Sequence, residues 1–476
     1  MRESTIFERQ PATAAVVAHS LEGSRRRSFW LDDVAGAERY PTLTADIDCD
    51  LVVVGGGYTG LWTALLAAQR DPGARVVLLE GGTVGWAASG RNGGFCEASL
   101  THGEENGRRR WPEEYDQLAR LGDANLDAIE RTVADLGIDC DFERTGSLDV
   151  AVEPHQVAWL DEADDDPDTV RLDEAGVRAE IASPTYLAGA WHRRSTAMLH
   201  PAKLAVGLAL AASEAGVQIY ERSVVRSIGD VAAGAGRVEV KTEHGRVWAG
   251  RVVLATNAFP SLLRRNALMT VPVYDYALMT EPLSPEQLAS VGWGNRQGVS
   301  DLANQFHYYR LSADNRVLFG GYDAIYHSGR RMDPAYEDRA ASFELLASHF
   351  FTTFPQLEGL RFTHRWAGAI DTSTRFCAFY GTARHGRVAY ATGFTGLGVG
   401  ATRFGAQVAL DLLDGTPTER TALRMVRERP LPFPPEPIAA LGINATRWSL
   451  DQADHRQGRR NVLLRALDAV GLGFDS

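Results

Sequence analysis

Short apolar runs and longer helical patterns alternate along much of the chain. Leu51–Val54 and Val76–Leu79 are continuous apolar runs, and Leu61–Gln69 between them has helical character. Short apolar runs bounded by turn residues are typical of buried strands, whereas longer periodic segments are typical of helices. This order predicts a strand–helix–strand unit from Asp46 to Glu80.

The same two patterns recur further along. Pro201 favours a helix start and Gly216 a helix end. We expect further helices at 113–136, 204–215, 340–351 and 401–413, and further strands at 145–151, 217–221, 237–242, 247–254 and 388–391. Residues 1–45 look like an irregular extension, in which Ser28–Leu31 is a candidate anchor packed on the main body. Beyond Asp414 we expect no fourth strand–turn–helix unit and a tail that is Pro-rich at Pro430–Pro437. The acidic run Asp161–Asp168 indicates a solvated loop or helix end rather than a metal site.

Three glycines stand at the turn between the first strand and its helix. Gly55, Gly57 and Gly60 allow a tight turn, close approach of a pyrophosphate, and close helix–strand packing, in that order. Glu80 follows twenty residues after Gly60 and can accept hydrogen bonds from a ribose. The first helical N–H groups favour phosphate binding. The pattern predicts an ADP-containing cofactor.

Composition excludes several classes of protein. The net charge of −12 over 476 residues argues against nucleic acid as a partner. The chain has no signal-peptide pattern near Met1 and no apolar stretch of membrane-spanning length. Its four cysteines form no C-x-x-C pair, which favours a reducing cytoplasm without structural zinc or another metal.

Four motifs together point to one family: 54–60 with Glu80, 85–94, 252–258 and 391–400. With them the chain resembles, from about Asp46 to Leu413, the D-amino-acid oxidase-like flavoenzymes, especially their bacterial amine branch. The resemblance implies FAD, bound non-covalently. The expected cofactor-binding residues are Gly55, Gly57, Tyr58, Thr59, Gly60, Glu80, Gly81, Ala88, Ser89, Arg91, Asn92, Gly93, Gly94, Val225, Ala255, Thr256, Asn257, Gly393, Thr395, Gly396, Leu397, Gly398, Val399 and Gly400.

The resemblance also implies the fold. Nucleotide-type patterns recur near residues 51, 252 and 390, which suggests a cofactor domain built from discontinuous pieces. We expect an α/β protein with a Rossmann-like FAD-binding domain and an inserted α+β substrate domain on a mostly antiparallel sheet. The expected division is an extension at 1–45, the FAD-binding domain at 46–125, 200–265 and 361–415, the substrate domain at 126–199 and 266–360, and a tail at 416–476.

The family chemistry, as the resemblance implies, is hydride transfer from an amine-bearing carbon to flavin N5, giving an imine that water hydrolyses. Segments 271–277, 306–310 and 318–322 look like the family's sheet over the flavin. Residues in or beside them are expected to contact a small amine substrate, although core packing is the alternative for each aromatic and a structural ion pair for the arginine: Tyr276, His307, Tyr308, Tyr322 and Arg310.

Three departures from the family pattern bear on the substrate and the flavin. Ile370 occupies the place, after Trp366-Ala-Gly-Ala, where amino-acid oxidases of the family often carry a carboxylate-binding arginine, although Arg375 is a possible substitute. No lysine occurs in Val317–Gly321, where sarcosine oxidases use one for oxygen reduction. Cys96 is a minor candidate for covalent flavin attachment. An amino-acid or N-methyl-amino-acid oxidase or dehydrogenase, and a non-catalytic flavin-binding subunit, stay open as alternatives.

Overall fold

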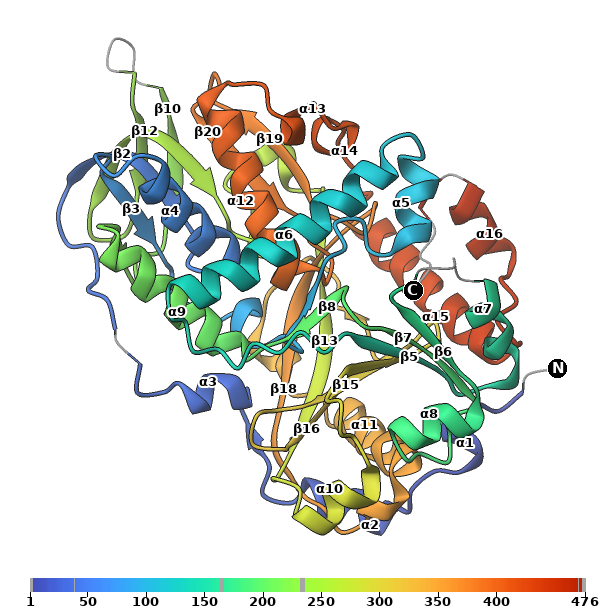
Figure 1. Ribbon diagram of the computed structural model, residues 1–476. Coiled ribbons are helices and arrows are strands. Elements are labelled where there is room, and N and C mark those ends of the chain that lie inside the picture. The colour runs from blue at the N-terminus through green and yellow to red at the C-terminus, as the bar shows by residue number, and fades with distance from the viewer. Residues whose placement is uncertain (1–2, 38, 163–166, 232–235, 470, 473–476) are drawn as a thin grey trace.

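Two large β-sheets organise the described part of the chain, residues 3–37, 39–162, 167–231, 236–469 and 471–472 of a computed structural model (Figure 1). The first has eight strands in the order β10-β11-β12-β2-β3-β9, with β20 beside β12 and β19 beside β20. Its strands are β2 (Ile47–Val54), β3 (Val76–Leu79), β9 (Gln218–Tyr220), β10 (Ser227–Val231), β11 (Val238–Lys241), β12 (Arg246–Leu254), β19 (Phe379–Ala383) and β20 (Val388–Thr392).

The centre of this sheet is parallel. Val54 is in register with Leu79 on one side and with Leu254 on the other, and Leu254 is in register with Tyr390. Alternate strand residues bury opposite faces. The sheet face that carries the Leu51 side chain packs on four helices: α4 (Tyr58–Arg70), α6 (Tyr115–Asp135), α9 (Pro201–Glu214) and α12 (Gly398–Asp414). The carboxyl ends of the parallel strands therefore meet at one edge, where ligands bind in open α/β sheets.

The second sheet is mostly antiparallel and has ten strands in the order β1-β18-β13-β16-β15-β14-β5-β7-β6, with β17 on β13. They are β1 (Arg25–Arg26), β5 (Ser147–Ala151), β6 (Thr169–Leu172), β7 (Ala188–His192), β13 (Thr270–Thr280), β14 (Gly298–Asp301), β15 (His307–Leu311), β16 (Val317–Gly321), β17 (Ile325–Tyr326) and β18 (Phe362–Ser373). Helices α8 (Glu174–Glu180), α10 (Pro285–Val291) and α11 (Ala340–Thr353) lie beside it. A two-stranded sheet, β4 (Phe95–Glu97) with β8 (Thr196–Met198), lies apart from both.

The expected mixed α/β fold with a second, mostly antiparallel sheet is confirmed. The expected helices and strands appear within four residues of their expected ends. Within the segment expected in the cofactor domain, Phe362–Ser373 forms β18 of the ten-stranded sheet, and α6 crosses the expected boundary at 125/126. Four residues of the acidic run, 163–166, lie outside the described residues, and the helix α7 (Val157–Glu162) ends just before them.

The expectation of an irregular N-terminal extension is wrong. The segment forms α1 (Ile6–Arg9), α2 (Ala14–Leu21), β1 and α3 (Phe29–Asp33). It is ordered because Phe29 and Trp30 are buried against apolar residues that include Met279 and Trp366. Two carboxylates at the end of α3 face histidines: Asp32 lies 3.2 Å from His364 Nε2, and Asp33 lies 3.3 Å from His200 Nε2.

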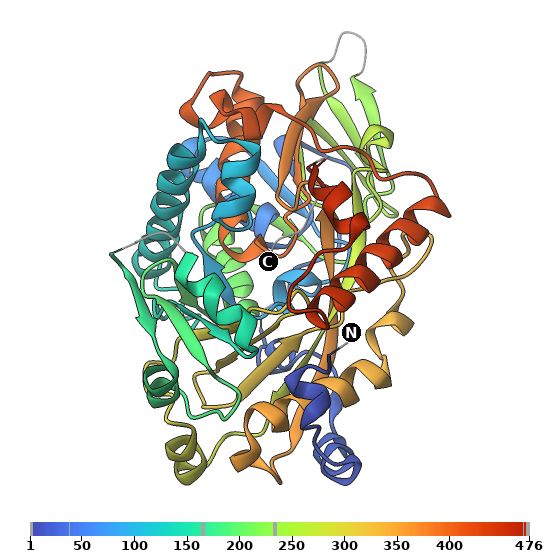
Figure 2. The same ribbon diagram turned by 90° about the vertical axis from the view of Figure 1, so that its right-hand side faces the viewer.

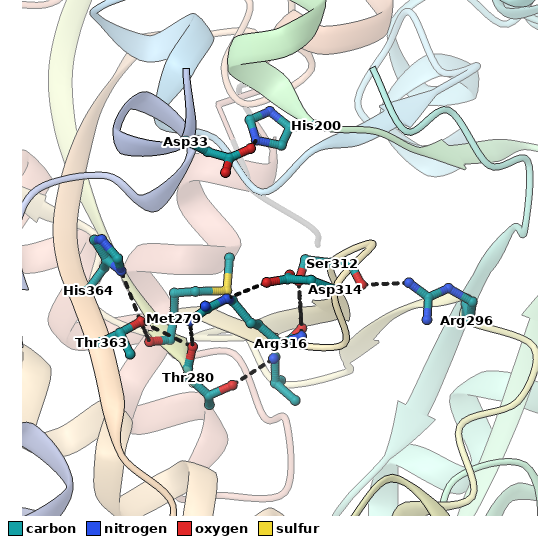
Figure 3. Close-up of polar contacts among 11 residues, drawn as sticks. Asp33, His200, Met279, Thr280, Arg296, Ser312, Asp314, Arg316, Thr363 and His364 are labelled. Atoms are coloured by element: carbon teal, nitrogen blue, oxygen red, sulfur yellow. Dashed lines mark hydrogen bonds and ion pairs between the residues drawn. The ribbon is translucent and has the colours of Figure 1, made fainter. Parts of the chain in front are cut away.

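Figure 3 shows the polar contacts beneath this segment. Thr363 Oγ1 donates to the carbonyl oxygens of Met279 and Thr280, and Arg316 Nη1 donates to the Thr280 carbonyl at 3.0 Å. Arg316 also pairs with Asp314 at 2.7 Å. These contacts join β13, β18 and the turn between β15 and β16 where α3 rests on them.

The described part of the tail after Asp414 contains no fourth strand–turn–helix unit, but it has helices that were not expected. The tail forms α13 (Glu419–Ala422), α14 (Arg424–Arg427), α15 (Ile438–Asp454) and α16 (Val462–Ala469). Figure 2 shows α15 and α16, in red, near the N-terminus. On α15, Ile438, Leu441 and Trp448 are more than half exposed. In the ranges described above, no helix is both long and apolar enough to cross a membrane.

Candidate active site

A cavity of about 1520 Å³ lies where the two sheets and the C-terminal tail meet. Its wall includes the carboxyl ends of β2, β3 and β12, residues of β5, β13 and β18, and the tail residues 431–450. Pockets for drug-sized ligands usually measure about 300–1,000 Å³. This cavity is larger, as a dinucleotide together with a substrate requires.

The glycine turn forms one end of the cavity. Gly55 has φ +113°, and a Cβ there would lie 2.4 Å from the Ala255 carbonyl oxygen. A Cβ on Gly60 would lie 1.8 Å from the Gly55 carbonyl oxygen, so Gly60 packs behind the turn and is not among the described residues that line the cavity. Gly57, Tyr58 and Thr59 do line it, at the start of α4. The N-terminus of α4 therefore faces the cavity with its positive dipole end.

Glu80 lies at the carboxyl end of β3 and lines the same region. Its carboxylate accepts hydrogen bonds from the backbone N–H of Gly56 at 2.6 Å, from that of Gly82 at 2.6 Å, and from Trp86 Nε1 at 2.8 Å. A carboxylate has about four acceptor positions. One position stays available for a ribose hydroxyl. Burial raises the pKa of Glu80, and these donors lower it. Gly81 and Val225 line the cavity beside it.

The loop from Ala88 to Gly94 closes over the start of α4. Ser89 Oγ accepts the backbone N–H of Tyr58 at 3.0 Å. The Asn92 side chain braces the loop from within, donating to the Ala88 carbonyl at 3.0 Å and accepting the Gly94 N–H at 2.9 Å. Arg91 Nη1 pairs with Glu337 at 2.5 Å. The structure thus brings Ala88, Ser89, Arg91, Asn92 and Gly93 to the wall. Gly94 lies behind it, because a Cβ there would meet the Leu199 carbonyl oxygen at 2.3 Å.

A buried carboxylate that the sequence analysis missed organises the fourth motif. Asp371 on β18 accepts the backbone N–H groups of Gly393 and Phe394, the latter at 3.1 Å, and the hydroxyl of Thr392 at 3.1 Å. The Asn257 side-chain amide donates to both of its oxygens, at 2.8 and 2.9 Å. Burial raises the pKa of Asp371 to about 6, although these donors lower it. The only sequence signal was an acid directly after the apolar stretch Trp366–Ile370.

Most remaining residues of the third and fourth motifs reach the cavity. The wall includes Ala255, Thr256, Asn257, Thr395, Gly396, Leu397, Gly398 and Val399. Gly393 and Gly400 are not among its described residues. Gly400 instead allows α12 to approach β4, since a Cβ there would lie 2.2 Å from the Glu97 carbonyl oxygen.

Tyr308 and Tyr322 also line the cavity, as a substrate-contacting role requires. The hydroxyl of Tyr308 donates to the Asp275 carboxylate at 2.5 Å. Asp275 is itself part of the wall, and burial raises its pKa to about 6. Sequence analysis missed Asp275 because its neighbours on β13 are apolar or aromatic and gave it no charge pattern.

Three expected substrate residues are not among the described residues of the wall: Tyr276, His307 and Arg310. The Tyr276 hydroxyl donates to the Tyr336 carbonyl at 2.8 Å. His307 is fully buried between Asp301, at 2.7 Å, and His349, at 2.8 Å.

Arg310 is 2 % exposed and donates to the Leu199 carbonyl at 2.6 Å and to the Gly94 carbonyl at 3.2 Å. Packing and internal hydrogen bonds thus occupy all three side chains, which argues against direct substrate contact.

The departures from the family pattern can also be located. Ile370 lines the cavity, whereas Arg375 is not among the described wall residues and donates to the Glu428 carbonyl at 3.1 Å. Cys96, the middle residue of β4, is fully buried, and burial raises the pKa of its thiol well above the usual range, which disfavours the reactive thiolate. No group of three or more His, Cys, Asp or Glu side chains suited to a metal ion occurs within the described ranges.

Residues 50–412 match the family described as DAO, FAD dependent oxidoreductase. Gamma-glutamylputrescine oxidoreductase of Escherichia coli strain K12 is 32% identical over 416 residues, which cover 84% of this chain and 92% of the relative. Sarcosine oxidase subunit beta of Arthrobacter sp is 26% identical over 355 residues, 68% of this chain and 76% of the relative. Among solved structures, glycine oxidase from Geobacillus kaustophilus superposes with a TM-score of 0.65 at 20% identity, covering 80% of this chain and 99% of that one. The structural likeness shows the same fold.

Proposed function

The chain belongs to the FAD-dependent oxidoreductase family, with FAD as its cofactor, and from this premise we propose that it oxidises the C–N bond of a primary or secondary amine to an imine. When bound, FAD supplies the acceptor for the hydride that leaves the amine-bearing carbon. The protein contributes binding, orientation and electrostatics. The substrate named by the E. coli relative, a glutamylated diamine, supports the amine class.

The residues around the glycine turn fit the cofactor. We assign the pyrophosphate to Gly57, Ser89 and the start of α4, and a ribose hydroxyl to Glu80. The support is physical: a Cβ on Gly57 would meet only Ser89, whose Oγ lies 2.9 Å away, so the space on this side of the Gly57 backbone is otherwise open to a phosphate. At the opposite end of the cradle, the start of α12 presents its N-terminal dipole to the same cavity and can stabilise negative charge on the cofactor.

The charge of the cavity wall carries the proposal that the substrate is an amine. Each arginine among the described wall residues is already paired with a carboxylate: Arg91 with Glu337 at 2.5 Å, Arg226 with Glu243 at 3.2 Å, and Arg447 with Asp323 at 3.4 Å. No further arginine or lysine of the described chain lines the wall, and Ile370 occupies the family's arginine position. A substrate carboxylate would therefore lack a cation, whereas an ammonium group would meet acidic side chains.

Tyr308, Tyr322 and Asp275 are the chain's contribution to substrate orientation in this proposal. Aromatic faces attract a cationic nitrogen and pack against its alkyl carbons. Above a pH of about 6, Asp275 is ionised and attracts the same nitrogen. These interactions orient the substrate in the cavity, and such orientation lowers the barrier of a reaction that the cofactor carries out.

Oxidation of an N-methyl amino acid is the second candidate, because the Arthrobacter relative is named for sarcosine. Anaerobic mixing of the purified flavoprotein with alkylamines, N-methyl amines, sarcosine and other amino acids distinguishes the candidates. We expect alkylamines to bleach the flavin absorbance. Bleaching by sarcosine or amino acids alone would replace the amine proposal, and no bleaching by any compound would indicate a flavin-binding subunit without turnover.

We also place the protein in the cytoplasm, which fits the four cysteines, all free and buried.

A further inference from the structure

Two acidic residues from separate elements line one region of the cavity. Glu97 is the last residue of β4, directly after the loop that closes on α4, and Asp149 lies in the middle of β5 in the ten-stranded sheet. Hydroxyl-bearing residues of β5, β8, β14 and the turn before β8 lie in the same wall: Ser147, Thr196, Ser300 and Ser195. This region is therefore polar and acidic, unlike the aromatic wall at Tyr308 and Tyr322.

Strand alternation directs both carboxylates into the cavity. On β4, Phe95 and Glu97 line the cavity, while Cys96 between them is fully buried in the core. On β5, Ser147 and Asp149 line it, while Leu148 between them is fully buried. Because successive strand side chains point to opposite faces, the backbone fixes the face on which each acid lies.

Glu97 is partly buried, and its carboxylate has no hydrogen-bond or ion-pair partner in the part of the chain that the structure describes. Burial, together with the negative charge of Asp149, raises its pKa to about 7. The Asp149 carboxylate does have partners: Ser300 Oγ donates to it at 2.8 Å, and His192 Nε2 lies 3.3 Å away. A desolvated, unpartnered carboxylate is costly unless a ligand supplies its partner.

From this arrangement we propose that Glu97 and Asp149 bind a second, cationic nitrogen of the substrate, so that the preferred substrates are diamines or longer polyamines. One nitrogen carries the carbon that is oxidised, and the other, as an ammonium group, donates hydrogen bonds to Glu97 and Asp149. The inference rests on the proposed amine oxidation and specifies its substrate class. A metal ion is a poorer occupant, because the described residues offer only these two acids and no third ligand.

The test compares two amines that share one reacting end: 1,4-diaminobutane and 1-aminobutane, at matched ionic strength. The apparent Kd for each is measured from flavin reduction in anaerobic stopped-flow experiments. We expect the wild-type holoprotein to bind the diamine more tightly by about tenfold or more, the effect of one desolvated charge pair. In Glu97→Gln, which keeps the shape of the side chain and removes its charge, the ratio of the two Kd values falls towards one.

Two further variants make the result specific. Asp149→Asn removes the second carboxylate from a different sheet and should also reduce the preference, so that a folding defect in one variant does not decide the outcome. Asp116→Asn removes a carboxylate from the surface of α6, where the side chain is 92% exposed, and should leave the preference unchanged. A wild-type protein that binds both amines equally, or variants that weaken both equally, would overturn the subsite.

A second readout separates the subsite from the reaction. The diamine should raise the thermal midpoint of the wild-type holoprotein more than the monoamine does, and Glu97→Gln should remove this difference. Stabilisation by the diamine without flavin reduction would reject the proposed function and keep the binding site. Reduction by both amines without a difference in stabilisation or Kd would keep the function and reject the site.

Discussion

The hydroxyl of Tyr308 on β15 donates to the carboxylate of Asp275 on β13 at 2.5 Å, inside the wall of the cavity. This bond favours the ionised form of Asp275, whose pKa burial raises to about 6. The ionised form is the one that attracts an ammonium group. The protonation of Asp275 therefore links the pH of the solution to amine binding.

Tyr308→Phe should shift the pH dependence of amine binding upward. Loss of a hydrogen bond to a charged group costs about 1.5–3 kcal/mol, which corresponds to about 1–2 units in the pKa of Asp275. The apparent Kd for an alkylamine, measured by anaerobic flavin reduction across pH, should then improve only at higher pH. Tyr276→Phe is the control, because its hydroxyl bonds to the Tyr336 carbonyl outside the wall. An unchanged pH profile in Tyr308→Phe would contradict a binding role for Asp275.

The advantage of a diamine over a monoamine should grow between about pH 6 and about pH 8, as Glu97 loses its proton. The pKa of Glu97 is raised to about 7, so the carboxyl is neutral below that value and charged above it. The measurement is the ratio of the two apparent Kd values as a function of pH. In Glu97→Gln the ratio should be flat over this range; a flat ratio in the wild type would rule out titration of Glu97 as its cause.

Gly57→Val should abolish FAD retention while the protein still folds. A side chain at Gly57 meets only Ser89 Oγ and projects into the space assigned to the pyrophosphate. Gly55→Val is the contrasting variant: its backbone has φ +113° and its Cβ would collide with the Ala255 carbonyl oxygen, so we expect it to unfold or aggregate. The ratio of flavin to protein absorbance and the thermal midpoint distinguish the two effects. Full flavin content in Gly57→Val would show that the phosphate lies elsewhere.

The Trp30 side chain should stabilise the loop from Ala88 to Gly94. Its indole Nε1 donates to the Asn92 carbonyl at 3.0 Å, and Ser28 Oγ donates to the Gly90 carbonyl at 2.7 Å. Trp30→Ala should lower the free energy of unfolding by about 3–5 kcal/mol, since the side chain is 1 % exposed. Trp30→Phe, which mainly removes the N–H, should cost about 1 kcal/mol and reduce flavin affinity. Urea unfolding and flavin dissociation measure these effects, with Trp448→Phe at an exposed position as the control.

Asp454→Ala should loosen the tail from the cavity. The carboxylate at the end of α15 accepts the backbone N–H of Asn304 at 2.8 Å, the side-chain amide of Asn304 at 2.7 Å, and the backbone N–H of Gln305 at 3.1 Å. Without it, we expect faster limited proteolysis within residues 430–472 and a higher KM for the amine. Asp451→Ala, on the same helix, is the control. Equal proteolysis rates in wild type and Asp454→Ala would show that other contacts hold α15.

The sequence predicted those features of the protein that depend on residues close together in the chain. A strand, a glycine turn and a helix at 51–69 are adjacent along the chain, so the cofactor cradle follows from spacing and periodicity alone. Tyr308 and Tyr322 were selected because a resemblance placed their strands over the flavin. Their neighbours Tyr276 and His307 were selected on the same ground, yet their side chains turn into the core, because alternation along a strand depends on register.

The missed residues depend on contacts between distant segments. Asp371 acts on backbone N–H groups 22 residues away, and Glu97 meets Asp149 only because β4 and β5 of different sheets face one cavity. Arg310 illustrates the opposite error: a buried arginine invites a binding role, but here it joins two carbonyl oxygens of the loop regions at Gly94 and Leu199. Charge and residue type do not reveal which backbone groups need a donor.

The N-terminal end of the described chain meets the end of α15, where Glu3 donates its backbone N–H to the His455 carbonyl at 2.9 Å and His455 Nε2 lies 3.0 Å from Glu8. Every glycine motif of the cradle precedes α15 in the chain. During synthesis the cradle is thus complete before the helix that covers it has left the ribosome. α15 lines the same cavity, so synthesis of every residue that we assign to FAD precedes the folding of this helix.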